Sequence, residues 1–94
     1  MEKIKTTDQL IEEITKRKDK LLLEADKNGL YENFGQKEVR EIENKLDLKS
    51  NRMKDITEAH EHIREFEYWC KTLDLRKLRK YKEEGYLETL KGGN

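Results

Sequence analysis

The residues of this chain that could act chemically are few, and the first is its one cysteine, Cys70. It follows Trp69 and precedes a basic stretch, and an electropositive setting is what activates a thiol nucleophile. Nucleophilic catalysis also needs a base and an oxyanion site, and no motif for either surrounds Cys70. Because free cysteines on apolar stripes usually pack in a core, we interpret Cys70 as a packing residue and expect no enzymatic activity.

The second candidate is a pair of imidazoles at His60 and His62, which suggests metal binding. Two residues apart on a helix, their rings point about 200° away from each other and cannot chelate one ion. Glu58 and His62 are four residues apart and could hold a metal weakly, but no third ligand is marked in the sequence. We therefore expect no metal, a half-buried His60 on an apolar stripe and a solvated His62.

The third candidate is a partial calcium loop. Glu24, Asp26, Asn28 and Gly29 occupy the first, third, fifth and sixth places of an EF-hand pattern. The twelfth place should supply a bidentate glutamate, but it holds Gly35. Without these two oxygens the pattern predicts the end of a helix and a turn, and the sequence indicates no cofactor.

Charge is distributed unevenly along a chain that is 45% charged and has a formal net charge of zero. Residues 52–70 hold five acidic and three basic side chains, a balance of −2, and residues 83–94 also balance to −2. The stretch 71–82 reaches +5, because Asp74 is its one acid. Its basic residues and the tyrosine among them are Lys71, Arg76, Lys77, Arg79, Lys80, Tyr81 and Lys82.

This basic stretch has four interpretations, which the sequence leaves open. It could be a solvated face, or it could dock an acidic protein partner. It could pair with the acidic stretch 52–70 of a second copy and form a self-complementary contact. It could also bind the phosphates of a nucleic acid or nucleotide, with Tyr81 stacking on a base.

The elements that position these residues should all be helices, since the chain has no proline, one valine and many Leu, Glu and Lys residues. Thr6 and Gln9 fit a capping box that opens a first helix, and Asn28-Gly29 is a stop signal for it. The same cap pattern at Asn33 and Gln36 predicts a second helix over 35–48.

A soft break at 49–51 follows, where Ser50 or Asn51 could cap a third helix that runs to Leu73. The alternative is one continuous helix over 35–73. Asp74 should cap a fourth helix with Leu75, Leu78 and Tyr81 on its apolar side, which Gly85 ends. Residues 86–90 could add one turn, and residues 1–5 and 91–94 are expected to fray.

These elements predict an all-α fold with a single domain over 1–94. It should have three or four helices, with a helical hairpin followed by a long third helix. A core of this size is thin, so we expect the bundle to associate with itself as a homo-oligomer. The expected oligomer seam is the apolar stripe of the third helix, formed by Ile56, His60, Ile63, Phe66, Trp69 and Cys70.

The sequence predicts a cytoplasmic protein without a membrane segment. Its longest apolar runs are three residues, 21–23 and 68–70, whereas a membrane helix needs about 20. No secretion signal is visible at the N-terminus. One cysteine cannot form an internal disulfide, which favours a reducing compartment.

The block LYENFGQKEVR at residues 30–40, with FEYWC at 66–70, resembles small uncharacterised helical accessory proteins of tailed bacteriophages. The resemblance implies the cytoplasm of an infected bacterium. It also implies action by binding, without catalytic residues to transfer. Together with the residues, it predicts a non-enzymatic binding protein, an accessory or inhibitor that acts on a host or phage protein. The alternative function is nucleic-acid or nucleotide binding through the helix 71–82.

Overall fold

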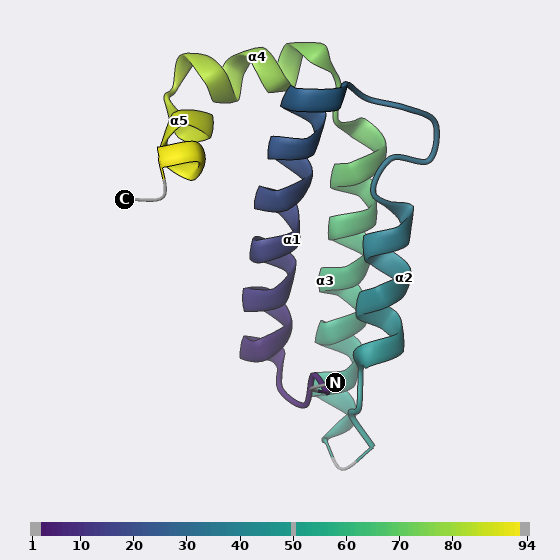
Figure 1. Cartoon of the computed structure of the whole chain (residues 1–94). Helices are drawn as coiled ribbons and strands as arrows, with labels where there is room; N and C mark the ends of the chain where they lie inside the picture. The colour runs from purple at the N-terminus through teal and green to yellow at the C-terminus, as the bar shows by residue number, and fades with distance from the viewer. Residues whose placement is uncertain (1–2, 50, 93–94) are drawn as a thin grey trace.

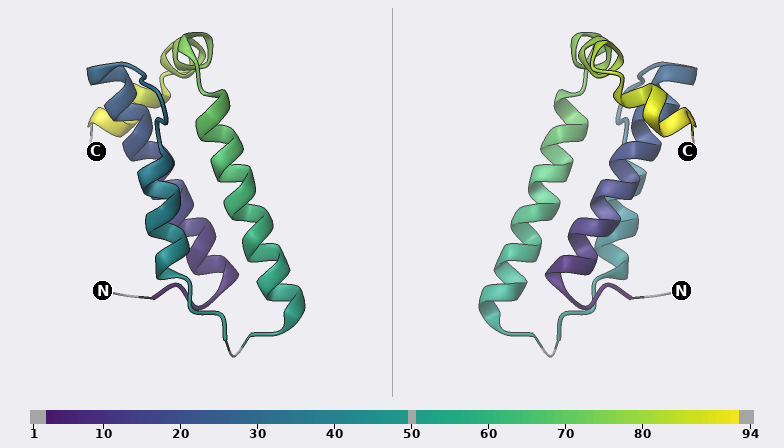
Figure 2. Two further views of the ribbon diagram at one scale, coloured as in Figure 1. Left: turned by 90° about the vertical axis from the view of Figure 1, so that its right-hand side faces the viewer. Right: turned by 90° about the vertical axis from the view of Figure 1, so that its left-hand side faces the viewer.

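The computed structural model describes residues 3–49 and 51–92, and this part of the chain is almost entirely helical. Three helices lie side by side, and the chain reverses direction between each helix and the next (Figure 1). A fourth helix crosses one end of this bundle, and a fifth turns back beside the first (Figures 1 and 2). The helices are α1 (Thr7–Asn28), α2 (Gln36–Lys45), α3 (Met53–Thr72), α4 (Leu75–Glu83) and α5 (Tyr86–Gly92).

Local signals set both ends of α1 as the sequence predicts. The Thr6 hydroxyl accepts a hydrogen bond from the Gln9 amide, and the Gln9 side chain accepts one from the Thr6 amide. At the other end Gly29 has a φ of 86° and its amide donates to the carbonyl of Ala25. These bonds satisfy backbone groups that a helix end leaves without partners.

The start of α2 differs from the prediction. Asn33 does not cap it; this residue has a φ of 62°, and Gly35, with a φ of 83°, stands at the N-cap position without a side-chain cap. Asn33 and Gly35 both adopt a left-handed backbone conformation, which the capping motif does not predict. The helix ends at Lys45, three residues earlier than expected.

Helices α2 and α3 are separate, so the continuous helix over 35–73 is wrong. The N-cap of α3 is Arg52, without a side-chain cap, so Asn51 does not have the expected role; Ser50 lies outside the described residues. The N-terminal segment helps to hold this connection. The Ile4 amide donates to the carbonyl of Lys45 at 2.8 Å, and the Asp47 amide donates to the carbonyl of Ile4 at 2.9 Å.

Within the described residues, both ends of the chain make contacts with the rest of the fold, where the sequence predicted fraying. Ile4 is buried in the core beside Leu46 and Leu48. Lys91 and Gly92 belong to α5, and Lys91 is held by an ion pair. Residues 1–2 and 93–94 lie outside the described part of the chain.

The core lies between α1, α2 and α3 and extends under α4 and α5. Its most buried large side chains are Leu10, Leu21, Leu22, Ile42, Phe66 and Leu87. The expected oligomer seam belongs to this core: Ile63, Phe66 and Cys70 are buried within one chain, and Ile56 and Trp69 pack against it. His60 is exposed on another side of α3. Ile63, Phe66 and Cys70 are therefore covered by their own chain, whereas Ile56 and Trp69 remain partly exposed.

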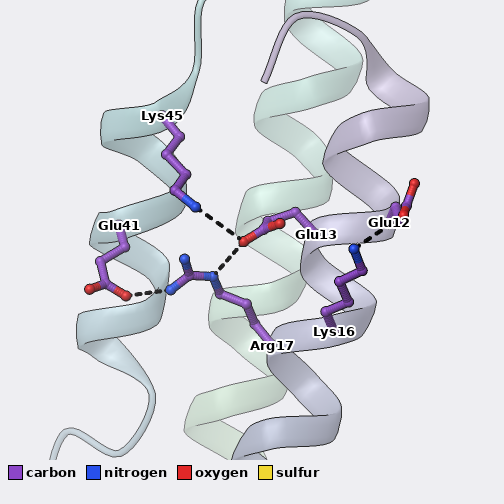
Figure 3. A network of polar contacts seen from close by, with 6 residues as sticks. All are labelled: Glu12, Glu13, Lys16, Arg17, Glu41 and Lys45. Atoms are coloured by element: carbon purple, nitrogen blue, oxygen red, sulfur yellow. Dashed lines mark hydrogen bonds and ion pairs between the residues drawn. The ribbon is translucent and has the colours of Figure 1, made fainter. Parts of the chain in front are cut away.

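A polar network joins α1 to α2 at the edge of the core (Figure 3). Arg17 donates to Glu13 at 3.0 Å on its own helix and to Glu41 on α2, and Lys45 of α2 reaches back to Glu13 at 3.5 Å. Burial opposes ionisation of Glu13, but the hydrogen bond from Arg17 and the charge of Lys45 lower its pKa overall. The network therefore holds the two helices in register with paired charges.

Two carboxylates of α1, Asp26 and Asp19, and two apolar contacts hold the C-terminal helices on α1. Asp26, whose side chain is 8% exposed, pairs with Lys82 of α4 at 2.7 Å and with Lys91 of α5 at 2.6 Å. Leu78 and Leu87 are buried beneath the two helices. Among the described residues, no helix is long and apolar enough to cross a membrane.

Candidate interaction surface

The structure gives Cys70 a packing role. Its side chain is buried among α1, α3 and Gly35. Burial, with the negative charge of Glu38, raises the pKa of the thiol to about 12. A thiol with such a pKa is almost entirely protonated near neutral pH, so Cys70 is not an activated nucleophile.

The candidate metal ligands are dispersed. His60 is exposed, where the sequence predicted a half-buried residue, and His62 is half-buried, where it predicted a solvated one. Within residues 3–49 and 51–92, no three His, Cys, Asp or Glu side chains meet in a group that could hold a metal ion. Asp26, from the partial calcium pattern, is engaged by two lysines, whose hydrogen bonds lower its pKa.

The basic stretch lies mainly on α4, which its own sequence and the bundle position together. The Asp74 carboxylate accepts from the Lys77 amide at 2.9 Å, so the predicted cap is confirmed. Leu78 is the one buried residue of α4, and Tyr81 is half-buried. The helix therefore rests on one narrow face and leaves most of its circumference exposed.

The structure separates the predicted basic residues by role. Lys82 is tied to Asp26, and Lys71, on α3, lies 3.8 Å from Glu67. The ammonium of Lys77 donates to the Thr72 hydroxyl at 2.9 Å. In the described part of the chain, no carboxylate lies within ion-pair distance of the following residues: Arg76, Arg79 and Lys80.

One side of α4 combines cations with an exposed apolar residue. Leu75, expected on the buried side of the helix, is 70% exposed. It borders a groove of about 350 Å³ between α4 and the end of α1, which Arg79 also lines. We call Leu75, Arg76 and Arg79 the outer face of α4. The sequence missed Leu75 because a leucine one turn before a buried leucine normally faces the same way.

The opposite side of α4 forms a second groove with α3. It has a volume of about 390 Å³ and is lined by Trp69, Lys77, Lys80, Tyr81 and Glu84. The indole nitrogen of Trp69 donates to the Tyr81 hydroxyl at 3.3 Å. The ring of Tyr81 packs 5.6 Å from that of Tyr86, centroid to centroid.

These aromatic contacts are structural. The Tyr86 hydroxyl donates to Asp19 of α1, and this bond, with burial, raises the pKa of Tyr86 to about 12. The ammonium of Lys18 lies 5.4 Å from the centroid of the Trp69 ring. Tyr81 therefore joins α3, α4 and α5.

Comparison with known proteins finds no match to this chain among family models, curated protein sequences or solved structures.

Proposed function

We propose that this protein is a non-enzymatic binding protein that docks an acidic protein partner on the outer face of α4. One observation carries the proposal: Arg76 and Arg79 have no carboxylate partner in the described residues and lie beside Leu75, which is 70% exposed. Arginine is enriched among the residues that contribute most to binding at protein interfaces, and the exposed Leu75 beside it offers apolar area that a partner can bury. Because the net charge of the chain is zero, acidic molecules are attracted by a local basic surface and not by the charge of the whole molecule.

Nucleic-acid binding is the weaker alternative because the cations do not share one face. Lys77 and Lys80 line the groove beside Trp69, whereas Arg79 lines the groove at the end of α1. A single phosphate backbone would contact about two or three of them. The slope of log affinity against log salt would then be only about −2 to −3, which is shallow for a nucleic-acid-binding protein.

The resemblance of residues 30–40 and 66–70 to phage accessory proteins supports a phage-type role for this binding. On this proposal the partner is a host or phage protein in the bacterial cytoplasm. The buried, unpaired thiol of Cys70 fits a reducing compartment.

The test is a comparison of two charge reversals with matched spacing. Arg76→Glu with Arg79→Glu changes the outer face of α4, and Lys37→Glu with Arg40→Glu changes exposed residues three apart on α2. Tagged proteins are purified from bacterial cells with and without nuclease, and the co-purifying molecules are quantified by mass spectrometry. We expect the same partner with the wild type and the α2 variant, and at least about tenfold less with the α4 variant, a change of 1.4 kcal/mol.

Circular dichroism verifies that both variants fold. Loss of the recovered molecule after nuclease treatment would show nucleic-acid binding instead. Equal recovery by the α4 variant and the wild type would show that the outer face of α4 is not the docking site.

A further inference from the structure

An acidic stripe runs along α3 and has no charged partner in the described residues. Glu58, Glu61 and Glu65 are spaced by three and four residues, which places them on one side of the helix. None of them forms an ion pair in the described part of the chain. Tyr68, one turn further, is 70% exposed, so the stripe ends in an uncovered aromatic side chain.

The stripe leads directly into the groove between α3 and α4. Trp69 lies four residues after Glu65, on the same side of α3, and it lines this groove with Lys77 and Lys80. The ammonium of Lys77 is held there by the Thr72 hydroxyl. One face of the molecule is therefore acidic along α3, aromatic at the end of that helix and basic at Lys77 and Lys80 of α4.

We propose that two copies of this chain pair through this face around a two-fold axis. In that arrangement the acidic stripe of each copy meets Lys77 and Lys80 of the other, and the two Tyr68 side chains lie near the axis. A two-fold contact uses the same patch on both molecules, and a patch that is acidic at one end and basic at the other is complementary to itself. The pairing closes on two copies.

Charges of both signs border this face, and Lys54 lies one turn before Glu58 on the same side of α3. Lys18 of α1 stands over the Trp69 ring, and Glu84 of α4 lines the far end of the groove. The zero net charge means that two copies approach without long-range repulsion. Any other partner would need an acidic region and a basic region at the same separation. A second copy of this chain has both regions at that separation.

The experiment is a charge exchange read out by molar mass. Glu61→Lys with Glu65→Lys reverses two of the three acids of the stripe, and Lys77→Glu with Lys80→Glu reverses both lysines of the groove. All four side chains are exposed. Light scattering at about 10 mM salt, where screening is weak, should give twice 11.4 kDa for the wild type and 11.4 kDa for each variant alone. An equimolar mixture of the two variants should return to twice 11.4 kDa, because both contacts are then attractive.

Controls separate this result from other causes. Lys37→Glu with Arg40→Glu on α2 should remain dimeric, and circular dichroism verifies folding of each variant. If a reversal unfolds the chain, Glu61→Gln with Glu65→Gln replaces it and should weaken dimerisation at least about tenfold.

A monomeric wild type, a dimer unaffected by either reversal, or a mixture that stays monomeric would each overturn the proposal. Arg76 and Arg79 are unchanged throughout, so failure here leaves the docking of another protein on the outer face of α4 to its own test.

Discussion

At the scale of single residues, Gly35 packs tightly against Cys70. Gly35 has a φ of 83°, a conformation that residues with a Cβ rarely adopt. A Cβ at this position would lie 2.5 Å from the Cys70 sulfur and 3.0 Å from its Cβ. The start of α2 and the packing around Cys70 therefore both require a residue without a Cβ at position 35.

Gly35→Ala should lower the free energy of unfolding by about 2–4 kcal/mol, since it adds a left-handed backbone penalty and an overpacked contact. Gly85→Ala is the matched control. Gly85 has a φ of 77°, but a Cβ added there would meet nothing within 4 Å, so this variant should lose only about 1–2 kcal/mol. Urea unfolding measures both. Equal losses would show that the contact with Cys70 contributes nothing.

At this scale, the sequence predicts a helix end correctly where the capping motif acts within one turn of helix. The capping box of Thr6 and Gln9 and the Asp74 cap are such cases, because both partners are three residues apart. It failed at Asn33 and His60, because the conformation of Asn33 depends on how the loop meets α3, and the exposure of His60 depends on which side of α3 faces α1 and α2.

At the scale of elements, the apolar stripe of α3 is the centre of the bundle. Helix α3 contacts both α1 and α2, and Phe66 is fully buried between them. The periodicity identified the apolar residues of this stripe but could not tell whether they face a neighbour in the same chain or a second copy. An amphipathic helix buries its apolar side in either case.

Phe66→Ala should therefore destabilise the monomer by about 3–5 kcal/mol, the usual cost of removing a buried aromatic ring. Tyr68→Ala, two residues away but exposed, should change the free energy of unfolding by less than about 0.5 kcal/mol. Thermal unfolding at low protein concentration compares them. A small effect of Phe66→Ala on the isolated chain would mean that this ring belongs to an interface between copies.

The attachment of α4 and α5 depends on the ion pairs of Asp26. Hydrogen bonds from Lys82 and Lys91 lower the pKa of this carboxyl below its ordinary value of 3.8. A carboxyl with a lowered pKa in the folded state stabilises it above the unfolded value, and this stabilisation is lost as the pH falls through the folded value. The two helices should thus loosen first on acidification.

Amide hydrogen exchange followed from pH 6 to pH 3 should show faster opening of α5 than of α3 at the acidic end, after correction for intrinsic rates. Asp26→Asn should open α5 already at pH 6 and remove most of this pH dependence. Unchanged protection of α5 in Asp26→Asn would show that Leu87 and the hydrogen bond from Tyr86 to Asp19 are sufficient to hold this helix.

At the scale of the whole molecule, the helical class followed from composition, and stop signals such as Gly29 and Gly85 located helix ends. The described residues form five helices, where the sequence predicted three or four. The sequence also located the basic stretch, but not which of its residues serve binding. Lys82 could not be recognised as structural because its partner, Asp26, is 56 positions away in the chain. Leu75 could not be recognised as exposed, because that depends on how α4 crosses the end of α1.

The most direct measurement of the proposed function replaces Leu75 with a photoreactive amino acid and identifies what it captures in cells. Met53 on α3, which is 76% exposed, is the control position. We predict a nuclease-resistant adduct with a protein other than this chain from position 75 and none from position 53. The same adducts from both positions, or an adduct with nucleic acid at position 75, would contradict protein docking on the outer face of α4.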